Sequence, residues 1–311
     1  MRLLKFHHIY SDISPSVVQS IDCPGANQQG ICLQVKRDDQ LHPVISGNKW
    51  RKLKHLLLKI ESQGYRRITA MGGPYSNLLH SLAYICHRLG WQFQMLVRAY
   101  PEQPLTPMLR DAKRWGAKIV YLDKKAFRQL RSEPPQLDEG EFWINEGGFH
   151  PDSFKGTQET FMEFAQLPDY LVMATATGAS LMGLALGAHR QSKPIKIIGI
   201  SVLNNAQQVA ADLDRLLPEQ VKRPELIQGY EFGGYAKSNQ ELDRFISGFE
   251  KEHAIALEKV YSGKSFYAVM DLIEKGYFAM GSRVCVIHCG GMQGKRNSTG
   301  VDLKEKRLTE S

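Results

Sequence analysis

The sequence predicts an α/β protein built from parallel sheets that helices cover on both faces. Short β-rich runs alternate with helical patterns along the chain. Several of these runs are continuously apolar, as expected of strands that are buried on both faces. The length of 311 residues corresponds to about two lobes. Because parallel strands require crossover connections, the alternation favours strand–helix–strand units throughout.

The predicted strands are short runs rich in β-branched and apolar residues. They cover residues 31–37, 67–71, 92–98, 118–122, 142–145, 170–175, 195–202 and 284–288. The predicted helices lie at 49–62, 77–89, 105–115, 155–166, 179–190, 205–216, 239–252 and 265–275. The polar stretch 124–141, which contains two adjacent prolines, and the stretch 217–234 are expected to be surface loops.

Capping residues mark the ends of two predicted helices. Asn48 is placed to cap the first of them, and Gly64 is placed to end it. The following helix opens near Ser76 and Asn77 and meets Gly90 at its end. Both segments carry apolar residues at helical spacing between these positions.

Composition excludes several classes of protein. Apolar residues make up 42% and charged residues 23%, which is typical of globular proteins rather than disordered or disulfide-rich ones. We expect no membrane span and no secretory signal, because no sufficiently long apolar run occurs. The five scattered cysteines indicate a reducing cytoplasm. The net charge of +8 fits either anionic ligands or a solvated basic surface. No motif indicates nucleic-acid binding.

Lys49 is the first candidate catalytic residue. It follows the turn Ser46-Gly47-Asn48 as the first residue of a predicted helix, where the positive end of the helix dipole disfavours a cation. Exclusion of water would favour the neutral amine further. A neutral lysine amine is a carbonyl nucleophile and can form a Schiff base. The competing interpretation is a solvated lysine at a helix start.

A second candidate site is the turn MGGPYSN at residues 71–77, between a predicted strand and a predicted helix. Backbone N–H groups at the start of a helix bind anions such as carboxylates. The hydroxyl of Ser76 could also take part in proton transfer. The alternative is that Ser76 or Asn77 only caps the helix.

A third candidate site is ATATGAS at residues 174–180, which follows an apolar strand. Thr177 and Ser180 offer hydroxyl groups, while Gly178 and Ala179 allow a ligand to approach the backbone. This pattern suits a phosphate held without a metal, although an ordinary strand–helix connection has the same composition. The spacing matches neither a Walker A loop nor a dinucleotide fingerprint.

The C-terminal part contains two further motifs, VYSGKS at 260–265 and HCGG at 288–291. The first is not a nucleotide loop, because Glu258 stands where a glycine is required. Cys285 and His288 would point to opposite faces of a strand. We therefore expect no metal site.

In this order, the motifs resemble the family of 1-aminocyclopropane-1-carboxylate (ACC) deaminase and D-cysteine desulfhydrase. They are KRDD at 36–39, SGNKWRKL at 46–53, GGPYSN at 72–77, NEGG at 145–148, TATGAS at 175–180, VYSGKS at 260–265 and HCGG at 288–291. The resemblance implies a pyridoxal 5'-phosphate (PLP) enzyme with the two-lobed tryptophan synthase β-like fold (PLP fold type II). It implies a large cofactor-binding domain of residues 1–49 plus 156–311 and a small domain of residues 50–155.

The resemblance also implies a role for each matching residue. Lys49 matches the Schiff-base lysine, and Lys52 would lie near the phosphate. Ser76 matches a residue that contacts the substrate carboxylate, and Asn77 would bind the phenolic oxygen of the cofactor. Tyr261 matches a tyrosine close to the substrate. The residues that match the phosphate cup are Thr177, Gly178, Ala179 and Ser180.

Three residues depart from the family pattern. Leu78 replaces a polar residue, Cys289 replaces a threonine beside the pyridine nitrogen, and Ser298 replaces a second tyrosine that ACC deaminases use in ring opening. The resemblance with these departures implies α,β-elimination from a small amino acid, with D-cysteine giving pyruvate, sulfide and ammonia. The alternatives are ACC deaminase activity and a catalytically silent PLP-binding relative. We expect a cytoplasmic homodimer.

Overall fold

The computed structural model describes residues 7–45 and 47–296. Ser46 and Ser298, which were both singled out above, lie outside this part of the chain. The strands are β1 (Val18–Ser20), β2 (Cys32–Lys36), β3 (Arg67–Gly72), β4 (Gln92–Arg98), β5 (Lys118–Leu122), β6 (Glu141–Ile144), β7 (Tyr170–Thr175), β8 (Lys196–Ser201), β9 (Glu225–Ile227) and β10 (Arg283–Ile287).

Helices precede or follow nearly every strand, as the sequence predicts. The α-helices are α1 (His7–Ser11), α2 (Pro24–Gln28), α3 (Asn48–Ser62), α4 (Asn77–Leu89), α5 (Pro107–Arg114), α6 (Lys124–Ser132), α7 (Pro151–Gln158), α8 (Ala179–Ala188), α9 (Ala206–Leu216), α10 (Gln240–His253) and α11 (Ser262–Glu274). Short 3₁₀ helices are η1 (Asp38–Gln40), η2 (Glu146–Gly148), η3 (Glu159–Glu163) and η4 (Met292–Lys295).

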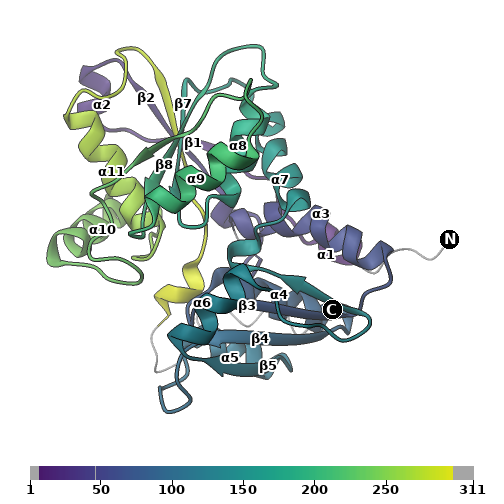
Figure 1. Ribbon diagram of the computed structural model, residues 1–311. Coiled ribbons are helices and arrows are strands. Elements are labelled where there is room, and N and C mark those ends of the chain that lie inside the picture. The colour runs from purple at the N-terminus through teal and green to yellow at the C-terminus, as the bar shows by residue number, and fades with distance from the viewer. Residues whose placement is uncertain (1–6, 46, 297–311) are drawn as a thin grey trace.

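The strands form two sheets in two lobes (Figure 1). One sheet has the order β1-β2-β10-β7-β8-β9 and is parallel except for the pairing of β1 with β2. The other has the order β5-β4-β3-β6 and is parallel throughout. The chain between β2 and β7 supplies the four-stranded sheet, so both lobes contribute loops to the space between them. The domain boundaries at residues 49/50 and 155/156 stay a prediction.

All eight predicted strands are confirmed to within two residues at their ends. The side chains of β10 show why the apolar runs in the sequence are continuous, because successive residues point to opposite faces of the sheet and both faces are buried. Val284 and Val286 pack into a core with α11 on one face of the sheet, while Cys285 and Ile287 pack into a core with α8 on the other. The short strands β1 and β9 carry too few residues to show a pattern, and the sequence did not predict them.

The loop predicted over residues 124–141 is wrong in its first half, where α6 forms. Asp123 caps this helix, and its side-chain oxygen accepts a hydrogen bond from the backbone N–H of Ala126 at 2.8 Å. Phe127 is the residue of α6 that is buried. Because so little of the helix is apolar, its periodicity is hidden among charged residues.

The cap predicted at Ser76 is confirmed, since its Oγ accepts a hydrogen bond from the backbone N–H of Leu79 at 3.3 Å. The cap predicted at Asn48 is wrong. The chain turns into α3 at Gly47, whose φ is +67°, and Asn48 is the first helical residue. A Cβ at Gly47 would overlap the carbonyl oxygen of Cys289, so this position requires glycine.

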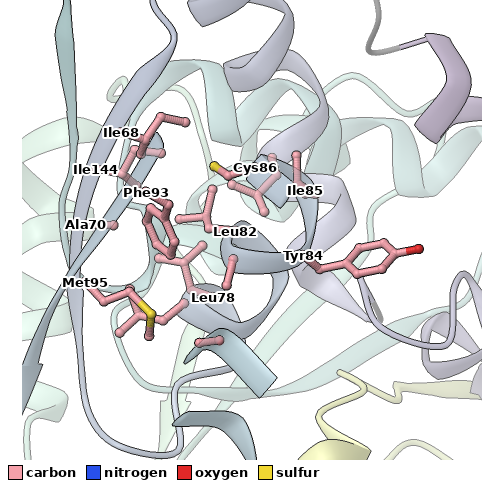
Figure 2. Packing of buried hydrophobic residues seen from close by; sticks show 14 of the residues in the cluster. Ile68, Ala70, Leu78, Leu82, Tyr84, Ile85, Cys86, Phe93, Met95 and Ile144 are labelled. Carbon is pink, nitrogen blue, oxygen red and sulfur yellow. The ribbon is translucent and has the colours of Figure 1, made fainter. Parts of the chain in front are cut away.

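Helix α4 packs its apolar face onto the four-stranded sheet (Figure 2). Leu78 and Leu82 lie among strand residues such as Phe93 and Met95. Leu78 is only 1% exposed, so the leucine that departs from the family pattern is accommodated as a core residue. Burial of this face fixes α4, and with it the turn that carries Ser76.

Candidate active site

A cavity of about 740 Å³ lies between the lobes, which is within the range of small-molecule sites. Its walls come from the segments that follow β3, β7 and β10 and from the starts of α3, α4 and α8. Every site residue that the sequence predicted lines this one cavity. They are Lys49, Lys52, Ser76, Asn77, Thr177, Gly178, Ala179, Ser180, Tyr261 and Cys289.

Lys49 lies in the first turn of α3, one residue further into the helix than predicted. Its amine donates a hydrogen bond to the side-chain oxygen of Asn48, and the Asn48 amide donates to the Ser180 hydroxyl at 3.1 Å. Burial lowers the pKa of Lys49 to about 8. About a tenth of the amine is therefore neutral at pH 7, roughly two hundredfold more than for a solvated lysine, and this neutral form is the nucleophile.

The start of α4 forms one wall of the cavity. A Cβ at Gly72 would lie 2.8 Å from the Ser76 hydroxyl oxygen, so the glycine turn lets this side chain lie against the strand end. The first backbone N–H groups of a helix have no partner within it, which applies here to Asn77 and Leu78. This wall can therefore bind a carboxylate.

The start of α8 forms the opposite wall. Gly178 begins the helix with a φ of +77°, a conformation that favours glycine. A Cβ at Gly147 would overlap the Thr177 hydroxyl, which shows how closely the segment after β6 lies against this turn. The Lys52 amine donates a hydrogen bond to the carbonyl of Gly147 at 2.8 Å. Hydroxyls, helix N–H groups and an amine thus surround a space suited to a phosphate.

Cys289 lies in the turn after β10, where its Sγ is 3.7 Å from the carbonyl oxygen of Ile287. Burial raises the pKa of the thiol to about 12, so it is protonated at neutral pH. In the same turn, a Cβ at Gly291 would overlap the Asn77 amide. Gln293 donates a hydrogen bond to the Asn77 side-chain oxygen at 2.5 Å. The Asn77 amide nitrogen keeps donors for a ligand oxygen.

Two tyrosines face the cavity, although the sequence indicated only Tyr261. The carboxylate of Glu258 accepts hydrogen bonds from the backbone N–H groups of Val260, Tyr261 and Ser262 at 2.6, 2.8 and 2.6 Å. This arrangement orients the segment that carries Tyr261. Burial raises the pKa of Tyr261 well above its usual value, so the phenol is a proton donor at neutral pH.

Tyr235 is the second tyrosine of the cavity. A Cβ at Gly73 would lie 3.2 Å from its phenolic oxygen, which places the ring against the turn before Ser76. The buried amine of Lys264 donates to the carbonyls of Glu231 and Gly234, both at 2.7 Å, and so holds the segment that leads to Tyr235. The pair Gly233-Gly234 before an aromatic residue was the signal that could have identified it.

The part of the chain that the structure describes offers no set of side chains that could hold a metal ion. No three side chains of His, Cys, Asp or Glu there come together in a way that could hold a metal ion. His288 instead makes a hydrogen bond between its Nε2 and the carbonyl of Ala256 at 2.7 Å. No helix in residues 7–45 and 47–296 is long and apolar enough to span a membrane.

The family model described as pyridoxal-phosphate dependent enzyme matches residues 20–290. The chain belongs to this family. A relative from Allorhizobium ampelinum, named 1-aminocyclopropane-1-carboxylate deaminase, is 27% identical over 298 residues, with 83% of this chain and 86% of the relative covered.

Solved structures agree with this assignment. One described as an ACC deaminase homologue has a TM-score of 0.79 and 27% identity, with 95% of this chain and 97% of that chain covered. A PLP-dependent aspartate racemase, at 14% identity, has a TM-score of 0.68, with 92% of this chain and 93% of that chain covered. This second likeness concerns the fold alone. The fold is therefore tryptophan synthase β-like, and the protein is an ACC deaminase-like member of the PLP family.

PLP is the cofactor, and the cavity fits it. The turn at Gly178 before α8 and the Lys52 amine suit the phosphate of PLP. The Asn77 amide suits its phenolic oxygen, and Lys49 is the amine that can react with its aldehyde. The Cys289 thiol is a weak donor beside the place expected for the ring nitrogen. The individual roles of these residues stay predictions.

The pKa of Lys49 predicts how cofactor loading depends on pH. Only the neutral amine reacts with an aldehyde, so the rate of PLP attachment to the apoenzyme should rise with pH up to about 8 and then level off. Stopped-flow absorbance measures this rate. Nα-acetyl-lysine, whose amine is fully solvated, is the matched control. Its rate of reaction with PLP should keep rising with pH until about pH 10.4, the pKa of a free lysine amine. An enzyme profile that follows the control up to that pH would contradict the assignment.

Proposed function

We propose that the protein is a PLP-dependent deaminating lyase that removes an α-proton and a β-leaving group from a small amino acid. With D-cysteine and water, the products would be pyruvate, hydrogen sulfide and ammonia. The observation that supports this proposal is one cavity that contains a lysine amine of lowered pKa, the backbone N–H groups at the start of α4 and a protonated phenol.

The residues of the chain divide this work between the two lobes. The turn from Thr177 to Ser180 would hold the cofactor phosphate, and the start of α4 with Ser76 would hold the substrate carboxylate. When bound, PLP accepts the electron pair that remains on the α-carbon after the proton leaves. Lys49, whose amine lines the same cavity, would be the base that takes that proton.

The leaving group becomes negatively charged as it departs. A hydrogen bond from a nearby O–H group stabilises this charge, and the phenol of Tyr261 keeps its proton at neutral pH. Glu258 keeps this tyrosine in the cavity wall through the backbone, so the acid does not have to move during the reaction. Tyr261 is therefore the proposed donor to the departing sulfur.

Ring opening of ACC is the second candidate. ACC has no α-hydrogen, so its reaction requires other groups close to the ring. Tyr235 supplies a second phenol in the cavity beside Tyr261, and the Allorhizobium relative carries the name of this activity. Ser298, which stands where the family has a second tyrosine, cannot replace a phenol because serine is shorter and far less acidic.

Steady-state assays separate the two candidates. We expect kcat/KM for pyruvate formation from D-cysteine to exceed that for 2-oxobutyrate formation from ACC. The substitution Tyr235→Phe should lower ACC turnover by about tenfold or more, while D-cysteine turnover should fall less. A larger kcat/KM for ACC would favour the second candidate. Absence of turnover with both substrates and with other small β-substituted D- and L-amino acids would overturn the proposed function.

We also propose a homodimer in the cytoplasm. The five cysteines are all free thiols, and four of them are buried. This state suits a reducing compartment.

A further inference from the structure

Three arginines line the side of the cavity formed by the four-stranded lobe. Arg98 is the last residue of β4, and Arg128 and Arg131 lie on α6. In Figure 1, α6 belongs to the lobe with β3, β4 and β5. No step of the proposed elimination uses these side chains, so their concentration at the cavity requires a separate explanation.

The ring of Phe127 positions two of the three guanidinium groups. Phe127 is 2% exposed, and the guanidinium carbons of Arg98 and Arg131 both lie 5.5 Å from the centre of its ring. A guanidinium that stacks on a ring keeps its N–H donors available at its edge. The two arginines are thus held in place while they can still bind an anion.

Carboxylates near the cavity neutralise only part of this charge. Glu146 forms an ion pair with Arg131. The other acidic residue of the cavity wall, Asp212, pairs with Arg215 at 2.9 Å. Within the described ranges, neither Arg98 nor Arg128 forms an ion pair with a carboxylate. Two positive charges at the cavity therefore remain without a matching anion.

The position of Arg98 places this charge on the substrate side. Val97 pairs with Gly72 across the sheet, so Arg98 lies beside Gly73 at the beginning of the turn that leads to Ser76. The Tyr235 phenol lies against the same glycine. The turn from Thr177 to Ser180 belongs to the other sheet. It meets this lobe at Gly147, next to the Glu146 that pairs with Arg131, so the cofactor content of the arginine variants is part of the test.

We propose that Arg98, Arg128 and Arg131 form a subsite for a second anionic group, carried on the side chain of the amino-acid substrate. The chemical class is an amino acid with a carboxylate, sulfonate or phosphate at its β- or γ-position, because guanidinium groups bind such oxyanions through paired N–H donors. This inference rests on the proposed function, which makes the ligand an amino acid.

Binding to the PLP-loaded enzyme tests the subsite without turnover. DL-2-amino-3-phosphonopropionate and DL-2-aminobutyrate share the amino-acid head, but only the first has an anionic side chain. Neither has a good β-leaving group. We expect calorimetry to show at least tenfold tighter binding of the phosphonate. In Arg98→Gln and in the double variant Arg98→Gln/Arg128→Gln, this preference should fall to threefold or less.

Two controls identify the source of any change. Arg244→Gln alters an exposed arginine on α10 that does not line the cavity, and it should retain the full preference. The PLP content of each variant, read from its visible absorbance, shows whether the arginines hold the cofactor phosphate instead. Loss of PLP from Arg98→Gln would overturn the subsite.

The remaining outcomes separate the two proposals. Equal binding of both probes to the unaltered enzyme would overturn the subsite but leave the proposed function in place. A double variant that kept the full preference for the phosphonate would likewise overturn the subsite alone. Failure of both probes to bind, together with no keto acid from D-cysteine or ACC, would overturn both proposals.

Discussion

We expect the substitution Lys49→Ala to lower kcat for elimination by about a thousandfold or more. This residue would both attach the cofactor and take the α-proton, and general base catalysis alone contributes about 10²–10⁴-fold. The other lysine of the cavity, Lys52, donates to the carbonyl of Gly147 on the side expected to hold the phosphate, so we expect it not to replace Lys49. Steady-state pyruvate formation from D-cysteine measures the effect.

A second lysine on the same helix provides the matched control. Lys59 lies near the end of α3, where its amine pairs with Asp152 at 2.9 Å, and it does not line the cavity. Lys59→Ala should keep kcat within about twofold of the unaltered enzyme, because Asp152 keeps its ion pair with Lys155 and no cavity residue is changed. Equal activity of the Lys49→Ala and Lys59→Ala variants would contradict the role of Lys49.

We expect Gly47→Ala to disrupt both stability and cofactor binding. Its Cβ would overlap backbone atoms of Cys289, and it would also lie close to the nitrogen of Gly290, 2.6 Å away. Backbone in a buried turn cannot move aside easily, and a φ of +67° adds strain for alanine. The free energy of unfolding should fall by about 3 kcal/mol or more, and PLP content should drop because α3 carries Lys49.

Gly64 separates the steric effect from backbone strain. It follows the other end of α3 with a φ of +83°, but nothing lies within 4 Å of a Cβ there. Gly64→Ala should therefore cost only about 1 kcal/mol and leave PLP content unchanged. Urea denaturation and visible absorbance provide both measurements. Equal losses in the two variants would show that Gly47 is not held against Cys289.

Much of the candidate site could be predicted because its residues belong to short motifs. Glycines close to Ser and Thr residues predict turns around Ser76 and Gly178, where a strand ends and a helix begins. Parallel strands present their carboxyl ends at one edge, so such turns meet in space. Lys49 was displaced by one residue in its helix, since Gly47 rather than Asn48 precedes α3.

The rest of the site depends on tertiary contacts that have no local signal. Tyr235 comes from a segment whose apolar residues show no helical or strand periodicity. The buried Lys264 on α11 holds that segment through a hydrogen bond to the carbonyl of Gly234. Arg128 and Arg131 of the proposed subsite were missed together with α6, in which Phe127 is the one buried residue. A helix with one buried side chain resembles a charged loop in sequence, and its orientation follows from packing alone.

Reduction of the PLP-loaded enzyme with borohydride tests the central claim most directly. Borohydride converts the bond between the cofactor and its lysine into a stable amine, which peptide mapping by mass spectrometry then locates. The account predicts the label on Lys49 alone. A label on Lys52, or on Lys264, whose amine is held between the carbonyls of Glu231 and Gly234, would contradict it.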